Sequence, residues 1–120
     1  MRLLDANMIL RYLLNDNEEM ANEVEALILE GSVQITIEVM AEVVYVLKGV
    51  YSIERDKIKS SLLNFLSEVQ SNDMEVLKVG LEVYARENLD FVDCILYAYN
   101  RVRGYEIKTF DKKLRRLLNQ

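Results

Sequence analysis

The chain opens with the stretch RLLDANMILRYLL, residues 2–14, and this stretch decides the expected fold. Its first residues are apolar and of strand length, whereas from Met8 onward the apolar residues are spaced to fall on one face of a helix. Asp5 therefore lies where a strand gives way to a helix. In a parallel α/β sheet this point is the carboxyl edge of the strands, where ligands bind. We expect Asp5 to bind a metal ion together with carboxylates from later segments.

The rest of the chain alternates short β-favouring runs with helical patterns. Strands are predicted at residues 2–5, 33–36, 74–79 and 105–109, and helices at 7–14, 18–30, 37–48, 53–71, 80–88, 90–103 and 111–119. Strands that alternate with helices favour a parallel sheet with helices on both faces. We therefore predict an α/β fold in which helices flank a short parallel sheet of four to five strands, formed by one domain of residues 1–120.

The composition excludes several kinds of chemistry. The 120 residues include no His and a single cysteine, Cys94. The absence of His excludes His general bases, Ser-His and Cys-His nucleophiles and His-ligated zinc. One cysteine excludes an internal disulfide, no apolar run reaches the roughly 18–20 residues that cross a bilayer, and the N-terminus has no signal-peptide pattern. We therefore expect a cytoplasmic protein with no membrane partner, and any hydrolysis must use carboxylates and a hard metal ion.

The net charge of −5 is unevenly distributed. Residues 1–100 carry 8 Lys and Arg against 18 Asp and Glu, a net charge of −10, whereas residues 101–120 carry 7 against 2, a net charge of +5. A basic end on an acidic body suits either an anionic polymer or a solvated terminal helix. Charge alone favours the solvated helix.

Three acidic residues lie beside or inside apolar runs. Asp5 follows two leucines, Glu42 lies within VMAEVVYVL (residues 39–47), and Asp93 lies within FVDCIL (residues 91–96). Half-burying an unpaired carboxylate costs several kcal/mol, and these runs contain no Lys or Arg. Either each carboxylate finds a distant cation, or the three share one. Ligation by oxygen alone selects Mg²⁺ or Mn²⁺.

Four further polar residues each have two interpretations. Asp111 suits a fourth metal ligand or a helix N-cap about equally. Asp90 lies one turn before Asp93 and is favoured as a helix N-cap. The alternatives are that it binds the metal ion or that it contacts a residue that does. Asn7 is slightly favoured as a cap over an amide that positions a ligand. Thr109 either presents its hydroxyl beside Asp111 or only favours a strand.

A cluster of three or four carboxylates around Mg²⁺ or Mn²⁺ suits phosphodiester hydrolysis. The ion polarises a phosphate oxygen and lowers the pKa of a bound water molecule, which attacks in line. No covalent nucleophile is required, in agreement with the absence of His. We expect activity to depend strictly on added divalent ion, because the acidic site repels phosphates without it.

Four stretches resemble, in order and spacing, the acidic motifs of PIN domains, most closely those of VapC-type toxins of bacterial and archaeal toxin–antitoxin pairs. They are LDANMILRYL (residues 4–13), AEVVYVL (41–47), DFVD (90–93) and TFD (109–111). The resemblance covers nearly the whole chain. It implies a PIN-like three-layer sandwich and a Mg²⁺- or Mn²⁺-dependent endoribonuclease. It also implies a homodimer, inhibition by a small cognate antitoxin protein, and cytoplasmic action on structured RNA.

The resemblance also assigns residues by position. Its metal-binding acids match Asp5, Glu42, Asp93 and, as the fourth, Asp111. Thr109 matches the hydroxyl residue before the fourth acid. Ala6 departs from the family, in which many members carry Thr or Ser, and this removes a hydroxyl contact there without affecting the metal site.

Other functions remain open at this point. A PIN nuclease could work in RNA processing without an antitoxin, and a catalytically silent dimeric binding module could retain the acids for its fold or its partner. A phosphoacceptor receiver domain also places acids at a sheet edge. It normally pairs two adjacent acids after the first strand, and Asp5-Ala6 lacks the second acid.

Overall fold

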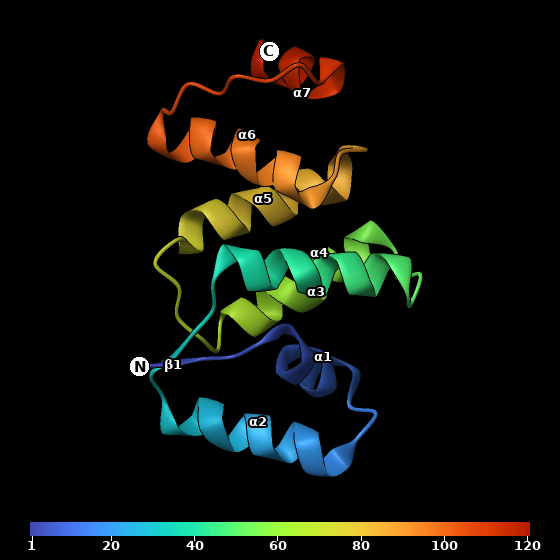
Figure 1. Ribbon diagram of the computed structural model, residues 1–120, viewed down its shortest axis with the longest axis vertical. Helices are drawn as coiled ribbons and strands as arrows, with labels where there is room; N and C mark the ends of the chain where they lie inside the picture. The colour runs from blue at the N-terminus through green and yellow to red at the C-terminus, as the bar shows by residue number, and fades with distance from the viewer.

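The computed structural model describes residues 1–120, and most of the chain is helical (Figure 1). The elements in order are β1 (Arg2–Leu3), α1 (Ala6–Leu14), α2 (Glu18–Glu30), β2 (Val33–Gln34), α3 (Ile37–Gly49), α4 (Arg55–Leu66), α5 (Met74–Arg86), α6 (Phe91–Arg103) and α7 (Lys112–Leu118). They stack along the longest of the three axes, which measure 46 × 30 × 19 Å, with α2 at one end and α7 at the other (Figure 1).

The sheet is parallel but smaller than predicted. β1 and β2 pair in parallel with Arg2 opposite Val33, and one further parallel bridge joins Gln34 to Gln70. The backbone N–H of Gln70 donates to the Val33 carbonyl at 3.0 Å. The predicted helix 53–71 is shorter than expected, because its last residues leave the helix to make this bridge. The prediction of four to five strands is therefore not confirmed, whereas the parallel direction is.

Helix α5 replaces both the strand predicted at residues 74–79 and the short helix predicted at 80–88. Its buried residues recur at helical spacing and are Val76, Leu77, Gly80, Leu81, Val83 and Tyr84. The prediction was wrong because a short apolar run that begins a helix has the same composition as a buried strand. A Cβ on Gly80 would lie 2.6 Å from Cδ1 of Ile95, so this glycine lets α5 approach α6 closely.

Residues 105–109, the fourth predicted strand, form no strand. They are held by α6 instead of by a sheet. The Asn100 side-chain amide donates to the Tyr105 carbonyl at 2.9 Å, and the Tyr105 ring stacks on Tyr99 with 5.8 Å between the ring centroids. β-favouring composition is a weak signal when side-chain contacts offer the backbone another partner.

Local signals did locate several helix ends. Thr36 caps α3, since its Oγ1 accepts a hydrogen bond from the Val39 N–H at 3.2 Å. Gly31 and Gly104 follow α2 and α6 with φ values of 86° and 71°, which glycine adopts without strain. The predicted limits of these helices are therefore confirmed to within one or two residues.

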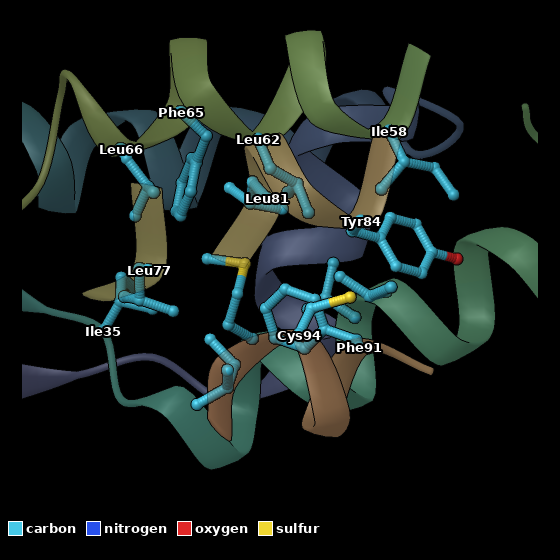
Figure 2. Close-up of a cluster of buried hydrophobic side chains, with 14 of the residues drawn as sticks. Ile35, Ile58, Leu62, Phe65, Leu66, Leu77, Leu81, Tyr84, Phe91 and Cys94 are labelled. Carbon is cyan, nitrogen blue, oxygen red and sulfur yellow. The ribbon is translucent and has the colours of Figure 1, made fainter. Parts of the chain in front are cut away.

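The core lies mainly between α4 and α5 and against the start of α6. Figure 2 shows α4 side chains facing those of α5, with Tyr84, Phe91 and Cys94 gathered at one side. Cys94 is fully buried, and burial raises the pKa of its thiol to about 12. No charged side chain is buried, so every acidic residue of the predicted site has access to water. No helix has both the length and the apolar character that crossing a bilayer requires.

Candidate functional site

Asp93 is the predicted site residue on whose carboxyl other predicted acids act. It lies in the first turn of α6 and is partly buried. Burial raises the pKa of its carboxyl above the usual value, and the negative charges of Asp111 and Asp90 raise it further. The carboxylates of Asp111, at the start of α7, and of Asp90 therefore lie near enough to Asp93 for their charges to act on it.

Asp111 is the N-cap of α7, one of its two predicted roles. Its Oδ1 accepts a hydrogen bond from the Leu114 N–H at 2.8 Å. The Thr109 Oγ1 accepts from the Asp111 N–H at 3.0 Å, so Thr109 fixes the turn that presents this carboxylate. Only one carboxylate oxygen is used by the cap. The capping role therefore leaves Asp111 able to bind a cation as well.

Asp90 occupies the N-cap position of α6, but its side chain accepts no capping hydrogen bond. The predicted position is confirmed and the predicted hydrogen bond is absent. Asp90 is exposed, three residues before Asp93 on the same helix. Its carboxylate is thus free to act as a ligand or as an outer partner of one.

Asp5 follows β1 and is the N-cap of α1, where its Oδ1 accepts from the Met8 N–H at 2.9 Å. The prediction that Asn7 caps this helix was wrong, because α1 begins one residue earlier, at Ala6. Asn7 is exposed in the first turn. Its amide is therefore available to a ligand beside Asp5.

Glu42 lies in the second turn of α3 and is exposed. The apolar run around it is a helix that buries Met40, Val43, Val44 and Leu47 and leaves Glu42 on the solvent side. The expected half-burial of the carboxylates was therefore wrong for Glu42 and for Asp5, which is also exposed. The free-energy argument for a shared cation applies to Asp93 alone.

The oxygen atoms of the predicted acids suit a metal ion, but their arrangement in the structure does not form a metal site. None of the five predicted acids forms an ion pair with Lys or Arg, so their oxygen atoms remain available to a hard cation. No group of three is arranged so that it could hold an ion, however. No hydrogen bond or ion pair links Asp5 or Glu42 to Asp93.

Sequence reasoning missed Arg55, which fixes the loop before Asp93. Its Nη1 donates to the carbonyl oxygens of Tyr84 at 2.9 Å and of Glu87 and Leu89 at 2.8 Å. Its guanidinium lies 4.1 Å from the centroid of the Tyr84 ring. A signal was present, because Arg55 begins α4, where a positive charge opposes the helix dipole. The turn that leads into α6 is therefore anchored to the start of α4.

A hollow of about 440 Å³ lies between α3 and the start of α6. Asp90, Arg55 and Lys48 are its charged residues, and Tyr45 and Phe91 contribute aromatic surface. The hollow gives the free carboxylate of Asp90 a neighbouring space that is partly apolar and partly polar.

The parallel strand pair and the helices around it form an α/β protein in which Asp5, Asp90 and Asp111 occupy helix N-cap positions. The family model of the PIN domain matches residues 2–118, nearly the whole chain, and the chain therefore belongs to the PIN-domain family. PIN domains are typically metal-dependent nucleases, which places this protein among the nuclease-type hydrolases. Neither the curated proteins nor the solved structures gave a match.

Proposed function

We propose that residues 1–120 form a Mg²⁺- or Mn²⁺-dependent endoribonuclease domain that hydrolyses RNA phosphodiester bonds. The observation that carries the proposal is the PIN-domain match over residues 2–118, together with the carboxylates gathered around Asp93. The proposed metal ligands are Asp5, Glu42, Asp93 and Asp111, with Asn7, Asp90 and Thr109 as accessory residues.

The electrostatics of Asp93 support a cation at this place. Its pKa is raised by burial and by two neighbouring negative charges, and no Lys or Arg is paired with it to relieve that repulsion. A divalent ion would do so. When bound, such an ion polarises a phosphate oxygen and lowers the pKa of a bound water molecule.

The chain's own residues have separate roles in this proposal. Asp93 and Asp111 supply negative charge from two helices, and Thr109 fixes the turn before Asp111. Asp90 has a carboxylate without a capping role and suits an outer position that orients water. Arg55 contacts none of these side chains; it holds the backbone that positions α6.

We further propose that the protein is a VapC-type toxin: a cytoplasmic homodimer that is inhibited by a small cognate antitoxin. The support is the resemblance of the four acidic motifs to those toxins. An RNA-processing PIN nuclease without an antitoxin would share the same chemistry. A small partner gene next to this one, whose product abolishes cleavage, distinguishes the two.

The test measures cleavage of total RNA and of a panel of structured RNAs by the purified protein. The wild-type protein is assayed with 5 mM Mn²⁺ and with EDTA, and the Asp93→Asn variant is assayed with 5 mM Mn²⁺. We expect cleavage only with the ion, and a loss on the order of a hundredfold or more in Asp93→Asn. Glu38→Gln is the control, because Glu38 is an exposed acid in the first turn of α3, and the cleavage rate of this variant should stay within about twofold of the wild-type rate. If the wild-type protein cuts no RNA with Mn²⁺, the silent binding module is the better interpretation. Equal cleavage by Asp93→Asn would remove the proposed site.

A further inference from the structure

The positive charge that is free to bind a partner is concentrated on α7. Four of its seven residues are basic: Lys112, Lys113, Arg115 and Arg116. The last 20 residues carry a net charge of +5, whereas residues 1–100 carry −10. A polyanion is therefore repelled by most of the protein and attracted to this end.

Three of these cations have no partner within the protein. Lys112, Lys113 and Arg116 are exposed and form no ion pair or side-chain hydrogen bond, and we call them the basic face. Other basic residues of the C-terminal end are occupied: Arg103 pairs with Asp73, and Arg115 donates to the Thr109 carbonyl. The basic face thus carries charge that internal contacts do not neutralise.

The other side of α7 holds the helix in place. Leu114 and Leu117 are 0% and 7% exposed and pack in the core, so the helix cannot turn its charged residues inward. Asp111 caps the first turn. The basic face is therefore presented to solvent by a fixed helix.

An exposed aromatic side chain lies immediately before this helix. Phe110 is 97% exposed, more than any other large hydrophobic residue of the chain. It stands between Thr109 and Asp111, which are joined by a hydrogen bond, so its backbone is part of an ordered turn. Leaving a whole phenyl ring in water has a cost, and a ring beside cations is the arrangement on which unpaired bases stack.

The basic face also adjoins the loop that leads to Asp93. A hollow of about 260 Å³ is lined on one side by Lys113 and Arg116 and on the other by the loop residues Glu87, Asn88 and Leu89. This loop continues directly into Asp90 and α6. A chain bound along α7 therefore lies next to the segment that carries the proposed acids.

We propose that α7 and Phe110 form a contact surface for single-stranded RNA, in which the basic face binds phosphates and Phe110 stacks on an unpaired base. The inference rests on the proposed function and deepens it, because it assigns α7 and Phe110, which lie outside the proposed metal ligands, to the binding of the RNA strand. Lysine and arginine bind backbone phosphates in any sequence. An aromatic ring reaches only bases that are not already paired and stacked in a duplex.

The experiment measures the binding of a fluorescein-labelled 20-nucleotide single-stranded RNA by fluorescence anisotropy, in EDTA and on an Asp93→Asn background. No cleavage occurs under these conditions, so binding is tested apart from the proposed hydrolysis. Lys112→Gln/Lys113→Gln/Arg116→Gln should weaken binding on the order of tenfold to a hundredfold at 0.1 M salt and flatten the slope of log K against log salt by about 2. The control is Lys57→Gln/Lys59→Gln/Lys78→Gln, which removes the same number of positive charges from α4 and α5, at lysines that line neither of the hollows beside the proposed acids.

Phe110→Ala tests the stacking contact separately. It should weaken binding of the single strand several-fold and leave binding of a duplex of equal length unchanged. Leu29→Ala is the control, because Leu29 is an apolar side chain 79% exposed on α2, at the opposite end of the molecule from α7 (Figure 1). Circular dichroism and melting temperature verify that each variant is folded.

Three results would overturn the proposal. The first is equal loss of RNA affinity in the α7 and control triple variants, which would mean non-specific attraction. The second is equal loss for single strand and duplex in Phe110→Ala. The third is binding of α7 to vesicles of phosphatidylserine and phosphatidylcholine with no binding to RNA, which would make the surface a membrane contact. RNA binding that depends on α7 in a protein that cleaves nothing would support this inference and remove only the proposed nuclease activity.

Discussion

The acids at the start of α6 and those at the starts of α1 and α3 have different surroundings. Asp93 is partly buried and influenced by two other carboxylates, and the loop before it is held by three hydrogen bonds from Arg55. Asp5 and Glu42 are exposed, and the only hydrogen bond to either side chain is the cap that Asp5 makes to its own helix.

The difference shows that contacts from other parts of the chain support the segment around Asp93, whereas Asp5 and Glu42 have no such support. The loop before Asp93 is fixed by Arg55, which is distant in the sequence, and the turn before Asp111 is fixed by the Thr109 side chain. Supporting contacts of this kind hold functional side chains in a productive geometry. Asp5 and Glu42 are positioned only by the helices on which they lie. If all four bind one ion, α6 and α7 supply the fixed part of the site, and the ion itself must recruit the other two carboxylates.

The largest expected effect tests the anchoring of the α6 end. Arg55→Ala removes the donor from three carbonyl oxygens and should lower the free energy of unfolding by about 3 kcal/mol. Urea denaturation measures this loss. Lys57→Ala, two residues further along the same helix and exposed, should change stability by less than about 0.5 kcal/mol.

Activity then shows whether the anchor serves the site. Val24→Ala is a second control, because Val24 is 1% exposed in α2, far from α6, and its truncation should destabilise the protein by about 2 kcal/mol. Below both melting temperatures, Arg55→Ala should lose cleavage activity and Val24→Ala should keep it. Equal activity in the two variants would make Arg55 a purely structural residue.

The next effect concerns which acids bind the ion. If Mn²⁺ binds the folded protein, a tenfold excess over its dissociation constant adds about 1.4 kcal/mol of stability, or roughly 5 °C in melting temperature. Differential scanning fluorimetry should show this shift in the wild-type protein and none in Asp93→Asn. Glu42→Gln should retain part of it, because Glu42 has no contact with the acids around Asp93. A full shift in Asp93→Asn and none in Glu42→Gln would mean that the ion binds at Glu42 and not at Asp93.

A smaller effect separates the two roles of Asp111. Asp111→Ala removes both the cap and the charge and should cost about 1 kcal/mol of stability. Asp111→Asn keeps a capping oxygen and removes only the charge, so it should unfold like the wild-type protein. Both should impair cleavage by at least tenfold if the carboxylate binds the ion. Full cleavage activity in Asp111→Asn would leave Asp111 with the cap alone.

These residues also show what the sequence can and cannot predict. The cap at Asp111 and the limits of the helices at 37–48 and 90–103 could be predicted from the sequence, because caps act within three or four residues. The run at 74–79 was misassigned because buried strands and helix starts share a composition. Arg55 was missed because its carbonyl partners lie 29 to 34 residues away, and that distance is a property of the packed chain.

The placement of the acids divides in the same way. Their positions at the starts of helices could be predicted from turn and helix patterns, and for Asp5, Asp90 and Asp111 this was confirmed. Their burial could not be predicted, because an apolar run around Glu42 does not show which face of α3 meets the core. Whether the four acids share an ion depends on tertiary arrangement and stays a prediction.

The smallest effect is the pH dependence of stability. The raised pKa of Asp93 means that the folded protein holds this proton more tightly than the unfolded chain, whose carboxyl titrates near 3.8. Its contribution to stability is therefore complete below pH 3.8 and is lost as the pH rises through the higher folded pKa. Asp93→Asn cannot lose a proton, so in EDTA it should match the wild-type protein at pH 3.5 and be slightly more stable at pH 7.

Glu106 should contribute to the pH dependence of stability with the opposite sign to Asp93. A hydrogen bond from Lys108 and its positive charge lower the pKa of the Glu106 carboxyl. Its contribution is therefore present above the unfolded pKa and is lost as the pH falls through the lower folded pKa. Glu106→Gln should be slightly less stable than the wild-type protein at pH 7, and solvent screening keeps this difference small. Urea denaturation of the wild-type protein and both variants between pH 3.5 and 7 measures the two slopes, and slopes of the same sign would show that the pKa of Asp93 is not raised in the folded protein.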